Sequence, residues 1–216
     1  MISIQIPLFV NRRNRYLCLL VMALSAWLLY AITNHLPPLV TPTVYTFTPI
    51  ERALPLLPWS IWPYLTCYFV MFFLALCLRD MSNLQRMLYA FVIVQVAANF
   101  VFLVYPVSLP RGLYPIPADA GPVARWLFNW TRHVDVDKNC QPSLHIANCW
   151  LVGLVYLREN RGKSWLVGSW LVLLSFSTLA TKQHYLWDVL GGVAVAVSVY
   201  ALAFSDQITL IDAPRH

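Results

Sequence analysis

The sequence predicts an all-α integral membrane protein, a bundle of six transmembrane helices with interfacial helices in its outer loops. Three observations lead to this fold class. Hydrophobic residues make up 59% of the 216 residues and charged residues only 11%, whereas a soluble domain is about 25% charged. The apolar residues gather in runs close to the roughly 20 residues that cross a bilayer. Proline and basic residues gather between these runs. A water-soluble domain and a disordered chain are therefore excluded.

The predicted spans belong to a single domain that covers residues 1–216. The first span follows three arginines, as the apolar core of a signal peptide also would, but no small-residue cleavage site comes after it. We therefore expect a retained helix. The fourth run is short, which places its first turn at the membrane interface. The six spans lie near residues 16–33, 61–78, 84–104, 143–157, 164–181 and 184–204.

The basic residues predict the orientation of the bundle. With the amino terminus inside, most of the 15 basic residues fall in the short inner segments, and fewer fall in the two long outer loops. By the positive-inside rule, both termini are cytoplasmic, and the membrane is expected to be a bacterial inner membrane. Basic residues in short clusters between apolar runs do not indicate a nucleic-acid partner. The sequence indicates no obligate protein partner either.

The second outer loop, residues 105–142, contains a predicted short helix. Apolar residues at positions 123, 126, 127, 130 and 134 recur at helical spacing, and two of them are tryptophans. An amphipathic helix with tryptophan anchors is typical of the membrane interface. A loop helix packed against the spans fits the pattern equally well. His133, Asp135, Asp137 and Lys138, which follow the stripe, are assigned to a solvated loop.

Five polar residues stand at the outer ends of the spans: Arg111, His145, Lys182, His184 and Asp188. Ionisable groups at membrane depth are costly and usually functional. The convergence of these residues was not used to derive the orientation, yet the orientation places all five at one membrane face. This convergence predicts a functional site there.

His184 and Asp188 are spaced i and i+4, which puts both on one face of a helix. A carboxylate there accepts a hydrogen bond from one imidazole nitrogen and makes the other a better nucleophile or base. The alternative is a polar pair that only stabilises the bundle. Residues 142–145, Pro-Ser-Leu-His, form a helix start whose free N–H groups bind anions such as phosphate. An ordinary capped helix with an interfacial histidine is the alternative for this segment.

Arg111 and Lys182 supply positive charge near these segments. A guanidinium can grip two phosphate oxygens at once, and both residues could equally contact lipid headgroups. The sequence has no zinc-type spacing of cysteine and histidine and no acidic cluster. It therefore predicts neither a metal nor a cofactor.

These residues resemble the signatures of the type 2 phosphatidic acid phosphatase superfamily. The segment 142–145 resembles its Pro-Ser-Gly-His signature, with Leu144 in place of glycine. Residues 177–188 read Ser-Thr, five residues, His, three residues, Asp, and resemble its Ser-Arg form, with Thr178 in place of arginine. The proline-rich segment that ends at Arg111 is similar to the inositol phosphorylceramide synthase, or aureobasidin-resistance, branch. Lys182 is interpreted as the cation that replaces the arginine missing at Thr178.

The resemblance implies a membrane enzyme that acts on a lipid phosphate or diphosphate at the outer face. His184 would attack phosphorus and form a phosphohistidine, Asp188 would orient it, and His145 would protonate the leaving oxygen. Phosphate binding would fall to four residues: Arg111, Ser143, Leu144 and Lys182. Three functions stay open. They are a phosphatase with water as acceptor, a phosphotransferase to a lipid or sugar hydroxyl, and a non-catalytic lipid transporter or scaffold.

Overall fold

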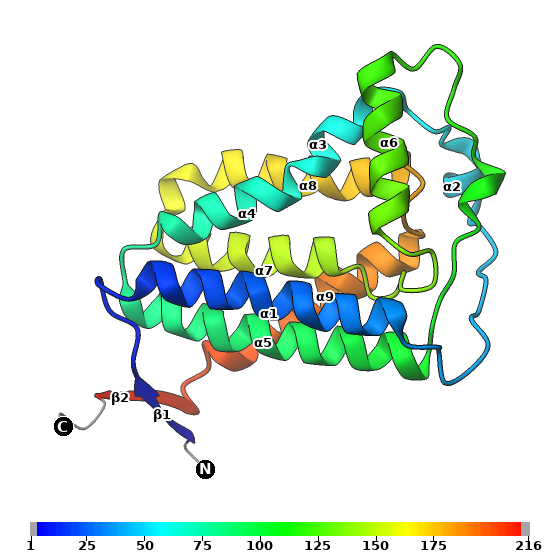
Figure 1. Cartoon of the computed structure of the whole chain (residues 1–216). Helices are drawn as coiled ribbons and strands as arrows, with labels where there is room; N and C mark the ends of the chain where they lie inside the picture. The colour runs from blue at the N-terminus through cyan, green and yellow to red at the C-terminus, as the bar shows by residue number, and fades with distance from the viewer. Residues whose placement is uncertain (1–3, 213–216) are drawn as a thin grey trace.

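The computed structural model describes residues 4–212 and is helical over most of its length (Figure 1). Long helices run side by side, and a short upright helix, α6, crosses one end of the bundle. The described termini lie together at the other end. The elements in chain order are β1 (Ile4–Leu8), α1 (Arg15–His35), α2 (Pro49–Ala53), η1 (Pro58–Ser60), α3 (Ile61–Leu65), α4 (Cys67–Leu76), α5 (Met81–Val104), η2 (Arg111–Leu113), α6 (Pro122–Val134), α7 (Leu144–Glu159), η3 (Arg161–Lys163), α8 (Ser164–Ala180), α9 (Leu186–Ala203) and β2 (Ile208–Asp212).

Four helical segments of the described chain are long and apolar enough to cross a membrane. They are α1, the run Pro58–Leu76, α5 and α9. The shorter α8 has 17 residues and α7 has 16. Large apolar side chains cover the outside of the bundle; Trp27, Phe69 and Trp165 are each more than two-thirds exposed. Such a surface suits hydrocarbon and not water, so the predicted class of helical membrane protein is confirmed.

The second predicted span, 61–78, is not one straight helix. It begins with η1 and α3, breaks at Thr66 and continues as α4. Pro63 has no N–H to donate within the helix, and the Thr66 hydroxyl donates to the Pro63 carbonyl oxygen at 2.5 Å. Local side-chain bonding of this kind bends helices. The bend lets the outer part of the span lean toward α6.

α7 is the central helix of the bundle and packs against α4, α5, α8 and α9. Ile146, Leu151 and Val155 are completely buried along it. A helix covered by neighbours on all sides needs fewer lipid-facing residues, which explains why this 16-residue helix suffices at the core. The residues at its first turn are thereby held by the whole bundle.

α7 and α9 approach so closely that only glycine fits at one position of the contact. A Cβ on Gly192 would lie 2.7 Å from the Ser143 carbonyl oxygen and 3.0 Å from the Ile146 Cβ. A Cβ on the neighbouring Gly191 would meet nothing nearer than 3.6 Å. The contact therefore fixes the start of α7 against the first turns of α9.

We expect Gly192→Ala to lower both the apparent melting temperature and the activity, because the backbone of Ser143 must move. Overpacking of this kind costs about 1–3 kcal/mol. Gly191→Ala is the matched control and should leave both unchanged. Thermal unfolding of the two purified variants in detergent measures the difference. Equal melting temperatures would show that the α7–α9 contact is not tight.

The end of the bundle away from α6 contains a small sheet that was not expected from the sequence. β1 and β2 pair in parallel, with Ile4 opposite Ile208. The predicted all-α class describes the bundle, and this short sheet is an addition to it. The Arg86 guanidinium supports the junction; it donates to the carbonyl oxygens of Ala203 at 2.6 Å and Ile208 at 2.8 Å. Both strands are five residues long and close to the chain ends, where helical periodicity gives no signal.

The predicted helix in the second outer loop is present as α6. Val123, Trp126 and Trp130 of its apolar stripe are exposed, whereas Phe128 is fully buried. Phe128 packs with Leu56 of the first outer loop and with Ile61 and Tyr64 of α3. Leu127 of the stripe packs against the same cluster, and the Trp130 ring centroid lies 6.3 Å from that of Tyr68, so the stripe is covered in part. This arrangement suits a helix that rests on the membrane surface.

Candidate active site

The start of α7 is bonded directly to the start of α9. Ser143 is the N-cap of α7, and its backbone N–H donates to the Asp188 carbonyl oxygen at 3.0 Å. The Ser143 hydroxyl is fully buried and has no hydrogen-bond partner among the described residues. The N–H groups of the first helical turn, beginning with Leu144, have no partner within the helix. This end of α7 therefore presents several donors that suit an anion.

The expectation that His184 and Asp188 share a helical face is corrected by the structure. α9 begins at Leu186, so His184 lies in the turn before the helix. Asp188 is in the first turn, and its Oδ2 accepts from the Tyr185 backbone N–H at 2.8 Å. The same oxygen lies 3.3 Å from His184 Nδ1. The predicted pair is therefore present, through a carboxylate that reaches back over the helix start.

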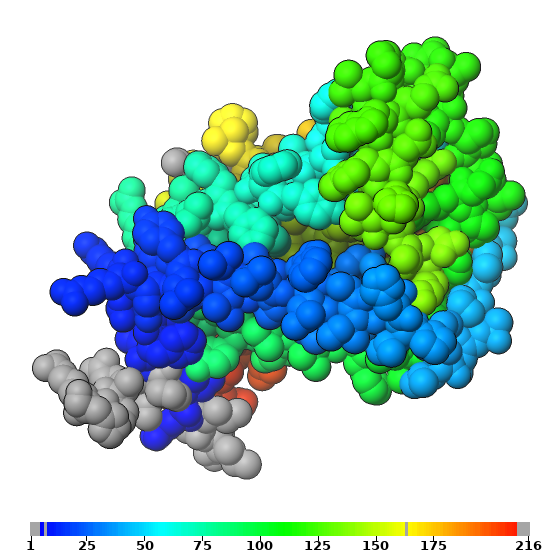
Figure 2. All heavy atoms as spheres, in the orientation of Figure 1, coloured from blue at the N-terminus to red at the C-terminus, as the bar shows by residue number. Residues whose placement is uncertain are grey.

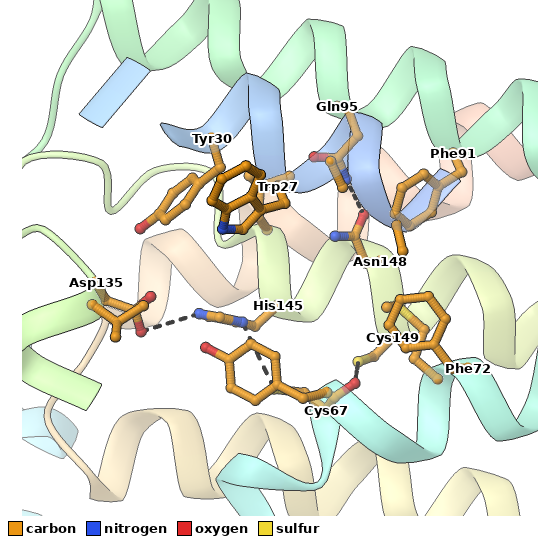
Figure 3. A pocket seen from close by; sticks show the side chains of 16 residues that line it. Trp27, Tyr30, Cys67, Phe72, Phe91, Gln95, Asp135, His145, Asn148 and Cys149 are labelled. Carbon is orange, nitrogen blue, oxygen red and sulfur yellow. Dashed lines mark hydrogen bonds and ion pairs between the residues drawn. The ribbon is translucent and has the colours of Figure 1, made fainter. Parts of the chain in front are cut away.

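The two predicted histidines lie opposite each other, with 6.0 Å between ring centroids. His145 Nε2 lies 3.4 Å from Asp135 Oδ2, and its Nδ1 lies 3.7 Å from the Cys67 sulfur (Figure 3). Both contacts are longer than good hydrogen bonds. Catalytic contacts are often long without substrate and tighten in the complex.

Asp135 is the main site residue that the sequence analysis missed. It was assigned to a solvated loop, but it is only 4% exposed. The Tyr64 hydroxyl donates to its Oδ2 at 3.0 Å, and the Arg111 guanidinium donates to its carbonyl oxygen. Burial alone would raise the pKa of Asp135. The positive charges of His145 and Arg111 and the Tyr64 hydrogen bond outweigh burial and hold this pKa below its ordinary value. The group is therefore a carboxylate that favours a protonated His145.

Arg111 and Lys182 both reach the site, but through protein partners. Arg111 is half-buried, and its Nε has no partner among the described residues. The Lys182 Nζ donates to the Glu51 carbonyl oxygen at 2.8 Å and lies 4.8 Å above the Tyr114 ring. Burial lowers the pKa of Lys182, and the negative charge of Glu51 partly opposes this effect. An ammonium has three donors, so two remain for a bound anion.

The turn that contains Lys182 is strained. Its φ is 55°, in the left-handed region that a non-glycine residue seldom adopts. Such strain persists only where surrounding contacts impose it, and it is concentrated at functional sites. In this conformation the Lys182 Nζ donates to the Glu51 carbonyl oxygen, and His184 follows two residues later beside Asp188.

Glu51 holds this turn and was not predicted as a site residue. Its Oε1 accepts from the Leu186 backbone N–H at 2.7 Å, and its Oε2 accepts from the Thr48 N–H and hydroxyl. The side chain is almost completely buried. One carboxylate therefore caps α2 and bonds to the start of α9. The Thr-x-x-Glu spacing of a capping box was the available signal in the sequence.

Three potential metal ligands lie together in the described chain, although the sequence predicted no metal. The ligand atoms of Cys140, His184 and Asp188 are all within 4.8 Å of one another. Burial raises the pKa of the Cys140 thiol, so a metal ion would have to displace its proton on binding. The cluster combines two predicted catalytic residues with a cysteine that no spacing indicated.

We expect turnover to be unchanged by EDTA, because the histidines, the carboxylates and the cations already supply the groups that phosphoryl transfer needs. Phosphate release before and after chelation measures this. A loss that Zn²⁺ reverses, and that Cys140→Ser alters, would identify the cluster as a metal site.

Comparison with known proteins agrees with the motifs. No curated protein matches the chain. A family model described as the PAP2 superfamily matches residues 51–202, a range that contains every site residue described above. Because this match covers more than half of the chain, the protein belongs to the PAP2 superfamily.

Proposed function

We propose that the protein is a lipid phosphate phosphatase that works through a phosphohistidine intermediate at the outer face of a bacterial inner membrane. Membership of the PAP2 superfamily suggests phosphatase or phosphotransferase activity in general. The observation on which the specific proposal depends is the pair of opposed imidazoles, 6.0 Å apart, each beside its own buried carboxylate. Two histidines with separate carboxylates can take different roles in one reaction.

In the proposed first step, His184 attacks the phosphorus atom. A hydrogen bond from Nδ1 to Asp188 leaves Nε2 with the free electron pair. A bond forms between Nε2 and phosphorus, and the bond from phosphorus to the alcohol oxygen breaks. His145, protonated beside Asp135, gives its proton to that oxygen. General-acid assistance contributes about 10²- to 10⁴-fold.

In the proposed second step, the nitrogen–phosphorus bond breaks. A water molecule gives a proton to His145, and its oxygen bonds to phosphorus. Phosphate leaves and His184 is restored. The phosphoryl oxygens are bound by Arg111, Lys182, Ser143 and the N–H groups that begin at Leu144, which stabilise the charge of the transition state.

Membrane topology forms part of the proposal. The six spans are the four long helical segments together with the shorter α7 and α8. The 16 residues of α7 are sufficient because this helix is covered by protein. The end of α7 and the start of α5, with the connection from α4 before it, lie at the end of the bundle away from α6 (Figure 1). These segments contain Arg79, Arg86 and Arg158. The positive-inside rule then places both termini in the cytoplasm.

A phosphotransferase is the second candidate. It shares every step up to the phosphohistidine, after which an alcohol replaces water. The observation that favours it is an apolar cavity of about 310 Å³ beside His145, where an acceptor alcohol could lie next to the base. The motif form of the inositol phosphorylceramide synthase branch, including the proline-rich segment before Arg111, supports the same function.

The deciding experiment measures phosphate release from lipid phosphates and diphosphates by the purified protein in detergent, with and without hydroxyl acceptors. The His184→Ala variant sets the background. Release that needs His184 and ignores acceptors establishes the phosphatase. A new phospholipid product that forms only with an acceptor establishes the transferase. Absence of both reactions would favour a non-catalytic lipid carrier.

A further inference from the structure

Three buried side chains that can bind a metal ion meet at the start of α9. The ligand atoms of Cys140, His184 and Asp188 all lie within 4.8 Å of one another, and each residue is at most 8% exposed. Sulfur, imidazole nitrogen and carboxylate oxygen are the donors that bind Zn²⁺ in proteins, whereas Mg²⁺ and Ca²⁺ prefer a shell of oxygens. The donor set therefore favours zinc among the common divalent cations.

The cluster is nearly compact enough for tetrahedral coordination. Zinc bonds of about 2.0–2.3 Å place neighbouring ligand atoms about 3.4–3.6 Å apart at tetrahedral angles. The observed separations of up to 4.8 Å have to shorten by about 1 Å at most. A small rotation of the Cys140 side chain about its Cα–Cβ bond can supply this movement without a shift of the backbone.

Two polar groups at this cluster have no hydrogen-bond partner among the described residues. They are Asp188 Oδ1 and the side-chain amide of Gln183, the residue before His184, and both residues are completely buried. A buried polar group without a protein partner is costly, and it commonly binds a water molecule or an ion. The Asp188 carboxylate thus has a free oxygen for an ion, while Oδ2 accepts from the Tyr185 N–H.

Charge balance also favours a divalent cation at this buried position. The Cys140 thiol donates to the Asp137 carbonyl oxygen at 3.1 Å. When zinc binds, the S–H bond breaks, the proton passes to water and a sulfur–zinc bond forms. The thiolate and the Asp188 carboxylate then carry two negative charges, which Zn²⁺ neutralises. A neutral cluster avoids the cost of an uncompensated buried charge.

An ion at this cluster stops the proposed reaction, on which this inference rests. That reaction uses both ring nitrogens of His184: Nδ1 donates to Asp188, and Nε2 attacks phosphorus. Zinc on Nε2 blocks the attack directly. Zinc on Nδ1 moves the ring proton to Nε2, whose free electron pair is then lost. Either mode of binding therefore removes the nucleophile.

The route to His184 is open to an ion. In the space-filling view a hollow opens between α1 and α4, beneath the base of α6 (Figure 2). His145 lines the cavity between these helices, and its ring centroid lies 6.0 Å from that of His184. In the proposed reaction a phosphoryl group reaches the space between the two rings. A zinc ion that has lost its waters is smaller than this group and can follow it.

We propose that Cys140, His184 and Asp188 form an inhibitory zinc site, at which Zn²⁺ binds reversibly and competes with the substrate for His184. Cys140 takes no part in the proposed steps of phosphoryl transfer. It is therefore the ligand whose replacement separates inhibition from catalysis.

The test measures turnover of the purified protein in detergent, in chelator-treated buffer, against increasing Zn²⁺. Each variant is compared with its own activity without metal. We expect Zn²⁺ to inhibit the unsubstituted protein, EDTA to restore its activity and Mg²⁺ to have no effect. Loss of a group that only orients a ligand costs about 10- to 100-fold in metal affinity, so Cys140→Ser should raise the half-inhibiting Zn²⁺ concentration by about 100-fold or more.

Two further variants complete the series. Cys140→Ala should behave like Cys140→Ser and suits a position that packs with Val107 and Leu109. Cys77→Ser is the matched control, the same substitution of a free cysteine that follows α4, and it should keep full inhibition. Inhibition that results from zinc binding to the lipid substrate would be equal in all variants and would overturn the inference.

Co²⁺ measures binding without turnover. An ion held by sulfur gives a thiolate-to-cobalt charge-transfer absorption, which we expect in the unsubstituted protein and in Cys77→Ser but not in either Cys140 variant. Absence of this absorption from the unsubstituted protein would overturn the inference. Loss of inhibition in Cys67→Ser alone would also overturn it, because the Cys67 sulfur lies 3.7 Å from His145 Nδ1. Cys140-dependent absorption without turnover of any lipid phosphate would confirm the metal site and overturn the proposed function.

Discussion

His184→Ala should abolish both turnover and the phosphorylated enzyme. The substitution removes the only atom proposed to bond to phosphorus. Its partner Asp188 stays at the start of α9, where Oδ2 accepts from the Tyr185 N–H at 2.8 Å. Loss of a nucleophile lowers kcat by on the order of 10³-fold or more. The intermediate can be trapped with ³²P-labelled substrate and separated under alkaline conditions, in which phosphohistidine is stable.

The matched control is His133→Ala, the same substitution at an exposed histidine on α6. It should leave both readouts unchanged. His145→Ala should lower turnover but still yield labelled protein, because His184 remains able to attack. Labelling that persists in His184→Ala and disappears in His145→Ala would reverse the two roles. Normal turnover in His184→Ala would refute the phosphohistidine mechanism.

The histidines of the site could be predicted because the cost of burying polar groups in a membrane is a strong constraint. His145, His184 and Asp188 stand at the ends of apolar runs, where ionisable groups are costly and usually functional. Ser143 followed from the chemistry of helix starts. Helix boundaries were less certain; α9 begins at Leu186 because the Asp188 carboxylate caps that position, a detail set by tertiary contacts.

The residues that were missed lie in the outer loops, where sequence gives little information about burial. Asp135 lies in a polar stretch of sequence that begins near His133, so composition predicts that its side chain is exposed to solvent. It is buried because α6 crosses the end of the bundle and brings this carboxylate to Tyr64 and His145. Cys140 reaches the site in the same way. The hydrophobic periodicity of a sequence does not show how a long loop folds back over a helix bundle. Glu51 did have a local signal in the sequence, the Thr-x-x-Glu spacing of its capping box.

Asp188→Asn should lower kcat by about 10²- to 10³-fold and leave the fold intact. The structure determines how the asparagine must lie. The Tyr185 N–H at 2.8 Å requires an acceptor at the position of Oδ2, so the amide oxygen must occupy it and the amino group must replace Oδ1. Oδ1 has no partner among the described residues, so the amino group meets no donor that would force a different rotamer.

In this orientation the amide oxygen still accepts from His184 Nδ1, so the tautomer that leaves Nε2 free is kept. Only the negative charge is lost. That charge matters most when the imidazole gains positive charge on bonding to phosphorus, so kcat should fall while KM changes little. Asp188→Ala removes the bond to Tyr185 as well, and it should lower the melting temperature in addition to kcat. Steady-state kinetics and thermal unfolding of both variants distinguish the role of the Asp188 charge in the reaction from its role in the fold. Full activity in Asp188→Asn would show that Asp188 only stabilises the start of α9.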